Sequence, residues 1–173
     1  MNNSNTAYFL LRAMLALAIL AGGCGSKPPR AHYEKAGGFS YDPPKGWRIL
    51  EFPGLKYRIS AGVSENGFAP NMNVVDESFR GPLTEYVDLN LENMKKMFVD
   101  FKVLKREDFQ TEDGLPAVRV VSEDTQQAKR LRQTFCFFNG SNRKYVVTCT
   151  APADGGEKLD ASFAESTKTF RVH

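Results

Sequence analysis

Apolar and polar residues alternate with a period of two over most of the second half of the chain. This spacing places alternate side chains on opposite faces of a strand. It predicts three hairpin-linked strands at roughly 101–111, 115–124 and 129–138, and a fourth at 144–150, with turns at Asp113-Gly114 and 139–142. An antiparallel sheet is therefore expected to dominate this half.

The spacing changes to three and four residues directly after Gly81-Pro82. Apolar side chains recur at helical intervals from Leu83 to Phe98, and Gly81 or Thr84 could cap the start. Near the C-terminus, Leu159 and Phe163 have the same spacing and precede a short strand at 169–172. Two helices are therefore predicted.

Short strands separated by turn residues are expected before the first helix. Prolines and glycines interrupt apolar runs at 39–41, 47–51, 57–61 and 72–74. Phe39 and Trp47, which flank the Pro43-Pro44 turn, are expected in the core. Runs of strands with segregated helices indicate an α+β fold, a twisted antiparallel sheet flanked by helices.

The first 23 residues have the pattern of an export signal. One cation, Arg12, precedes the apolar run 13–21, which is too short to cross a bilayer. Gly22-Gly23-Cys24 then resembles the bacterial lipobox, so Cys24 is predicted to be the lipid-bearing first residue of the mature protein. The alternative is an ordinary secretory signal cut near Ala21 that leaves Cys24 as a free thiol.

The stretch after Cys24 has the composition of a linker. It contains glycines, two prolines and few apolar residues, so we expect a flexible tether over 24–37 and one domain over 38–173. The lipid would hold the protein at a membrane of the bacterial envelope. Ser26, where some inner-membrane lipoproteins carry aspartate, favours the outer membrane facing the periplasm.

The overall charge does not indicate a nucleic-acid partner. The formal net charge is +3, and acidic and basic residues are mixed along the chain. A local basic excess could face anionic lipid or an acidic partner, and consists of Lys129, Arg130, Arg132, Arg143 and Lys144. The alternative is a sheet face covered by arginine stems.

No set of catalytic or metal-binding residues stands out. The chain has two histidines, His32 in the expected tether and His173 at the C-terminus, where chains are usually mobile. Histidine-dependent triads, a metal site and a cofactor are therefore not expected. Acidic pairs at 107–108, 112–113 and 123–124 could serve a carboxylate-dependent glycan hydrolase, but turn and solubility roles are favoured.

Two further cysteines lie in the last predicted hairpin. Cys136 and Cys149 would face each other and could form a disulfide if residues 141–144 form the loop. A loop at 139–142 would instead pair Cys136 with Tyr145. Two buried thiols are the other alternative.

Several stretches taken together resemble the PsbP-like superfamily, and in particular its small bacterial lipoproteins of the DcrB type. The resemblance covers about 38–172. It rests on 39–47 (FSYDPPKGW), 69–75 (APNMNVV), 83–87 (LTEYV), 114–117 (GLPA), 145–151 (YVVTCTA) and 168–171 (KTFR). It implies a central twisted antiparallel sheet with helices on its sides, and docking onto partners without a shared catalytic site.

These observations favour a membrane-anchored, non-catalytic lipoprotein that displays a protein-docking domain in the bacterial envelope. The partner is expected to be another envelope protein. The alternative is a lipoprotein that binds a small ligand or a metal in a pocket between sheet and helix. A carboxylate-dependent glycan hydrolase comes third.

Overall fold

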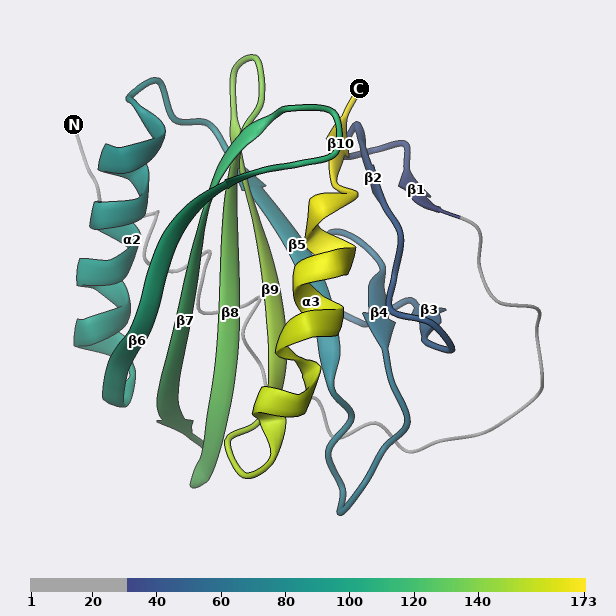
Figure 1. Ribbon diagram of the computed structural model, residues 1–173, viewed down its shortest axis with the longest axis vertical. Coiled ribbons are helices and arrows are strands. Elements are labelled where there is room, and N and C mark those ends of the chain that lie inside the picture. The colour runs from purple at the N-terminus through teal and green to yellow at the C-terminus, as the bar shows by residue number, and fades with distance from the viewer. Residues whose placement is uncertain (1–30) are drawn as a thin grey trace.

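The computed structural model describes residues 31–173 and contains two antiparallel sheets and two α-helices (Figure 1). A small sheet has the order β1-β2-β10, and a seven-stranded sheet has the order β3-β4-β5-β9-β8-β7-β6. The fold is thus an α+β sandwich, as predicted. The expected signal at 1–23, Cys24 and the tether residues before 31 lie outside the described residues.

The predicted strands of the second half are present with bounds shifted by a few residues at most. They are β6 (Val99–Gln110), β7 (Pro116–Gln126), β8 (Lys129–Asn139) and β9 (Lys144–Pro152). Each pairs antiparallel with the next along the chain. β9 also pairs with β5, so the first half of the chain continues this sheet.

The shorter strands follow the predicted turns. They are β2 (Phe39–Tyr41), β3 (Arg48–Leu50), β4 (Ile59–Ala61), β5 (Asn71–Glu77) and β10 (Arg171–Val172). The expected turn forms at Asp113-Gly114 between β6 and β7. Gly114 has φ 80°, a backbone conformation that glycine adopts without strain.

The two helices cover opposite faces of the large sheet. α2 (Leu83–Met97) packs on Val118, Val120, Phe135 and Phe137. On the other face, the 3-10 helix η1 (Gly156–Leu159) leads into α3 (Asp160–Lys168), which packs with the small sheet on a second core. β8 is therefore buried on both faces. Pro82 occupies the cap position of α2, so neither expected cap residue, Gly81 or Thr84, is used.

The core beneath the small sheet is aromatic. Phe170 stacks on Phe138 with ring centroids 4.3 Å apart, and Phe39 stacks on Phe170 at 5.6 Å. The Trp47 ring meets Phe163 of α3 edge-on at 5.8 Å. Phe39 and Trp47 are thus core residues, as the sequence predicted.

The folded domain begins earlier than predicted. Residues of the expected tether form β1 (His32–Glu34), which pairs with β2 in the register His32 to Tyr41. His32 is buried, with its ring 5.3 Å from that of Tyr41. The tether expectation is therefore wrong for residues 32–37, because strand pairing and ring packing compensate for their linker-like composition.

Candidate functional site

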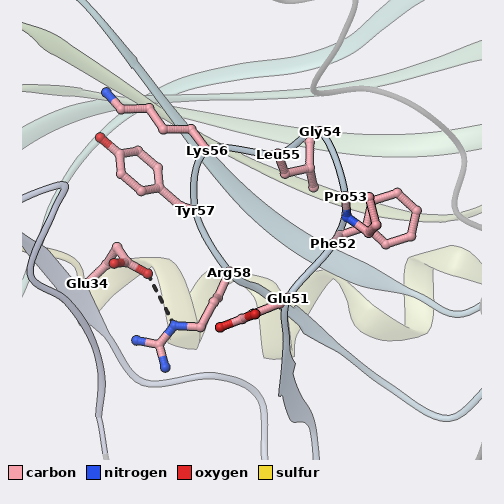
Figure 2. Close-up of a pocket in the computed structure, with 9 residues that line it drawn as sticks. All are labelled: Glu34, Glu51, Phe52, Pro53, Gly54, Leu55, Lys56, Tyr57 and Arg58. Atoms are coloured by element: carbon pink, nitrogen blue, oxygen red, sulfur yellow. Dashed lines mark hydrogen bonds and ion pairs between the residues drawn. The ribbon is translucent and has the colours of Figure 1, made fainter.

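A pocket of about 590 Å³ lies beside β1, lined by Glu34 and residues 51–58 (Figure 2). The lining segment connects β3 to β4 at one edge of the large sheet. Pro53-Gly54 turns the chain, with Leu55 N–H donating to the Phe52 carbonyl at 3.1 Å and Gly54 at φ 86°. This is the arrangement that a type II turn requires of proline and glycine.

Arg58 joins the pocket to the N-terminal strand. Its Nε donates to Glu34 Oε2 at 3.3 Å, and its Nη2 donates to the Tyr33 carbonyl at 3.0 Å. The Arg58 side chain keeps 42% exposure, whereas that of Glu34 keeps 13%. Figure 2 shows the Glu51 carboxylate on the same side of the loop as the guanidinium. The pocket thus presents a positive charge from Arg58 and a negative charge from Glu51. Apolar surface of Phe52 and Leu55 and the ring of Tyr57 complete its lining.

A buried carboxylate anchors the far side of the loop. Asp76 on β5 accepts hydrogen bonds from Lys56 Nζ at 2.6 Å and Tyr57 OH at 2.8 Å, and it pairs with Arg143. Burial raises the pKa of Tyr57. For Lys56, burial alone would lower the pKa, but the hydrogen bond and charge of Asp76 outweigh it and the pKa is raised. The carboxylate therefore holds the loop against the β8–β9 turn.

The predicted basic patch is not a single surface. Arg130 and Arg132 pair with Glu123, and Arg132 also makes a two-point contact with Asp160 of α3 at 3.0 and 2.7 Å. Arg143 and Lys144 lie toward the opposite end of the hairpin, because Asn139 pairs with Lys144 in the β8–β9 register.

The remaining cations of that patch are also engaged. Lys144 is buried, with its Nζ 5.8 Å from the centre of the Phe79 ring. Lys129 Nζ lies 5.8 Å from the centre of the Phe68 ring. The five cations therefore do not form one continuous surface: nearby carboxylates pair with the arginines, and aromatic rings lie close to the lysines. An interaction role for these residues stays a prediction.

Cys136 and Cys149 are free, buried thiols. The loop is 140–143, so Cys136 lies opposite Val147, and Cys149 lies opposite Thr134. Neither register considered from the sequence occurs, and the disulfide is not formed. Burial raises the pKa of each thiol, which keeps both protonated and chemically quiet.

Both histidines are held in place, contrary to expectation. The backbone N–H of His173 donates to the Gly38 carbonyl at 2.8 Å. The Nε2 atom of its ring is hydrogen-bonded to Ser40 Oγ at 2.9 Å. His32 Nε2 lies 3.8 Å from Glu34 Oε2, and burial lowers the pKa of His32, helped by Arg58. A serine–histidine contact alone lacks the orienting acid that a triad uses.

The acidic pairs of the sequence are mostly bound in ion pairs. Glu107 pairs with Lys105 and Arg119, while Glu112 and Asp113 pair with Arg171. Within residues 31–173, no cluster of histidine, cysteine and acidic side chains could hold a metal ion. Asp124, from the acidic pair at 123–124, differs from these paired carboxylates, because it is buried and has no ion pair among the described residues.

Sequence reasoning missed the residues that build the pocket. Glu34 and Arg58 are 24 positions apart, and Asp76 and Arg143 are 67 apart. The Pro53-Gly54 turn was visible in the sequence, but nothing in it links that turn to β1 or to the β8–β9 loop. These contacts depend on the order of strands in the two sheets.

Comparison with solved structures identifies the architecture. Cyanobacterial PsbP (CyanoP) from Synechocystis sp. PCC 6803 superposes with a TM-score of 0.63 at 12% identity, over 89% of this chain and 98% of that chain. The chain has a PsbP-like fold. LpqN of Mycobacterium tuberculosis, described as involved in cell envelope biogenesis, has a TM-score of 0.58 at 12% identity, over 78% and 82% of the two chains.

A yeast protein shares the same PsbP-like architecture. The Ran-binding protein Mog1p of Saccharomyces cerevisiae has a TM-score of 0.58 at 9% identity, over 83% of this chain and 94% of that chain. No family model matches the sequence. No curated protein matches it either. Among the helices described, none is long and apolar enough to cross a membrane.

Proposed function

We propose that this protein is a lipid-anchored envelope lipoprotein of the DcrB type, whose PsbP-like domain docks onto another envelope protein. The lipobox-like Gly22-Gly23-Cys24 supports the anchor. The charged pocket beside β1 carries the docking role. In this proposal the protein has no catalytic activity of its own, and outer-membrane residence remains favoured by Ser26.

The start of β1 limits how far the domain can stand from the membrane. Seven residues separate Cys24 from His32, where the fold begins. Fully extended, they span at most roughly 25 Å. Because β1 is paired with β2 and bound to Arg58, the pocket beside it would stay close to the lipid headgroups. A partner reaching it would be a membrane protein or an envelope protein held at the same surface.

The pocket has the composition of a docking site. Phe52 and Leu55 are half-buried, so each offers apolar surface at the rim of the pocket. Arg58 and Glu51 offer opposite charges for pairing, and such charges set orientation and partner choice more than affinity. Two PsbP-like neighbours are described by what they bind or affect, as a Ran-binding protein and as a protein of envelope biogenesis.

Site-specific photocrosslinking tests the docking role in intact cells. A photoreactive residue at Leu55, in the pocket, should give a discrete adduct with a membrane-associated protein. The matched control is Leu104, which is 41% exposed on β6, at the opposite edge of the large sheet from β3. Equal adducts from both positions, or none from Leu55 in the anchored protein, would contradict the proposal.

Reversing the charge of Glu51 tests whether the pocket contacts the partner without changing the stability of the fold. Glu51 is exposed and has no ion pair among the described residues, so Glu51→Lys should weaken the Leu55 adduct without lowering the melting temperature. Glu165→Lys, on the exposed side of α3, is the control and should leave the adduct unchanged. An adduct that survives Glu51→Lys at full yield would show that the pocket's charge does not contribute.

A further inference from the structure

A second pocket, of about 560 Å³, lies between the start of α2 and the ends of β6, β7 and β8, and we call it the α2 pocket. Its volume falls within the roughly 300–1,000 Å³ that is typical of small-molecule sites. Most of its lining side chains are exposed or half-buried, so it is open to solvent. Because β6 and β3 are the two edge strands of the large sheet, the α2 pocket is separate from the pocket beside β1.

The register of β6 and β7 gives the α2 pocket an apolar floor and a polar wall. Val118 of β7 packs against α2, so Pro116, the next but one residue of that strand, lies on the same face of the sheet. These two residues form the floor. Asp108 of β6 lies opposite Val118, and Gln110 lies opposite Pro116. The exposed carboxylate and the exposed amide therefore stand side by side along one wall.

The first turn of α2 and the end of β8 form the other sides of the α2 pocket. Leu83 is half-buried and adds apolar surface, while Thr84 is exposed and adds a hydroxyl group. Asn139 of β8 also lines the pocket, and its side-chain oxygen is enclosed without a hydrogen bond in the described structure. The terminal torsion of asparagine is broad, so a donor in the pocket can draw this oxygen toward it. The α2 pocket thus combines an apolar floor with hydrogen-bond acceptors on two sides.

The charge of the lining indicates which ligands fit. None of the residues that line the α2 pocket is a lysine, arginine or histidine. Asp108 makes no ion pair among the described residues, and Arg106 on the same strand is already paired with Asp88 at 2.6 Å. The free N–H groups at the start of α2 carry partial positive charge, but Glu85 in the first turn offsets it. Asp108 would therefore repel an anion and attract a protonated amine.

We propose that the α2 pocket binds a small organic cation, namely a primary amine that carries an apolar group. The ammonium group is a donor at each of its hydrogens, and it donates to the Asp108 carboxylate and to the side-chain oxygen of Gln110. The apolar group of the ligand covers Pro116 and Val118 on the floor of the pocket. This inference does not depend on the docking pocket beside β1, which is built from other residues.

Titration of the intact protein with 2-phenylethylamine, in a non-ionic detergent at neutral pH and constant ionic strength, tests this site. Matched probes each lack one feature: 2-phenylethanol is neutral, 3-phenylpropionate is an anion, and methylamine has the cation without the ring. Binding to the native state alone must raise the melting temperature. Backbone amide NMR shifts on the same samples give the affinity and locate the site. We expect 2-phenylethylamine to shift the amides of 108–110 and 117–118 most, and the other probes to bind about tenfold more weakly or less.

Asp108→Asn is the decisive variant, because it removes the charge from an exposed side chain, keeps its shape and should leave the fold intact. The affinity for 2-phenylethylamine should fall by about tenfold or more, the value of one hydrogen bond to a charged group. Asp154→Asn is the matched control. Asp154 is exposed after the C-terminal end of β9, whereas Asn139 of the α2 pocket lies opposite the first residue of that strand. This control should bind the amine as the native protein does.

Several results would overturn the assignment. One is the absence of any change in melting temperature or amide shifts with 2-phenylethylamine. Another is equal affinity for 2-phenylethanol or 3-phenylpropionate, which would show that the pocket does not select a cation. Unchanged amine affinity in the folded Asp108→Asn variant would exclude the carboxylate as its partner. Amide shifts confined to 51–58 would place the amine in the pocket beside β1 and equally overturn the inference.

Discussion

Asp124 makes the stability of the fold depend on pH. Burial raises its pKa to about 6, from an ordinary value of 3.8, although the Gln126 side chain opposes this. The folded state therefore binds the proton more tightly than the unfolded chain. The stabilisation is complete below about pH 4 and is lost as pH rises through about 6.

Replacing Asp124 with asparagine should remove this dependence. Discounted for residual solvent screening, the variant should gain about 1–2 kcal/mol in unfolding free energy at pH 7.5 and little at pH 4. Urea denaturation at both values measures the difference. An equal effect at both pH values would show that the carboxyl group does not titrate in this range.

Loss of the Asp76 carboxylate should lower the free energy of unfolding, because three side chains share it as a partner. Asp76→Ala leaves Tyr57 OH buried without its acceptor and separates Lys56 and Arg143 from their shared partner. Because those two cations are each more than 40% exposed, the expected loss is about 2–3 kcal/mol, below that of a fully buried pair.

Asp88→Ala provides the comparison for Asp76. The Asp88 side chain is 61% exposed and pairs with Arg106 at 2.6 Å on the surface. Surface pairs contribute about 0–1 kcal/mol, so chemical denaturation should separate the two variants clearly. Similar losses would mean that Asp76 does not hold the loop at 51–58 in place.

At the scale of elements, β1 should respond to acid before the rest of the sheet does. Burial, assisted by Arg58, lowers the pKa of His32 below 6.5, although Glu34 opposes this. A lowered histidine pKa stabilises the fold above pH 6.5 and loses that contribution as pH falls. Protonation would place a charge between Phe39 and Tyr41, and would favour release of β1.

Hydrogen exchange at pH 5 and 7.5, corrected for intrinsic rates, would detect this release. Protection at 32–34 should fall at pH 5 while protection in β9 is retained, and His32→Phe should abolish the pH effect. Parallel loss of protection in both strands would indicate global unfolding instead. A released β1 would lengthen the tether and move the pocket away from the membrane.

The sequence pattern predicted some strands and helices well and missed others. Strong period-two alternation and the Asp113-Gly114 turn were enough to predict β6 to β9, and spacing from Leu83 to Phe98 was enough for α2. β1 was missed because three residues with linker composition carry no periodic pattern. The Cys136 pairing was missed because shifting the loop by one residue moves the pairing register by two.

At the scale of the whole molecule, contacts across long sequence separations form the docking pocket. Glu34 on β1 of the small sheet meets Arg58, which directly precedes β4 of the large sheet, and Asp76 on β5 meets Arg143 of the β8–β9 loop. The α+β class follows from local patterns, whereas strand order does not. The pocket beside β1 could therefore be recognised only from the structure.

The central claim, a lipid-anchored domain held close to the envelope membrane, depends on Cys24. Intact mass spectrometry of the protein purified from membranes tests it most directly, with Cys24→Ser fractionated in parallel. We expect a native mass beginning at Cys24 and carrying acyl chains, and a variant that is either unprocessed or released as a soluble form. A native protein that begins at another residue and carries no lipid would contradict the account.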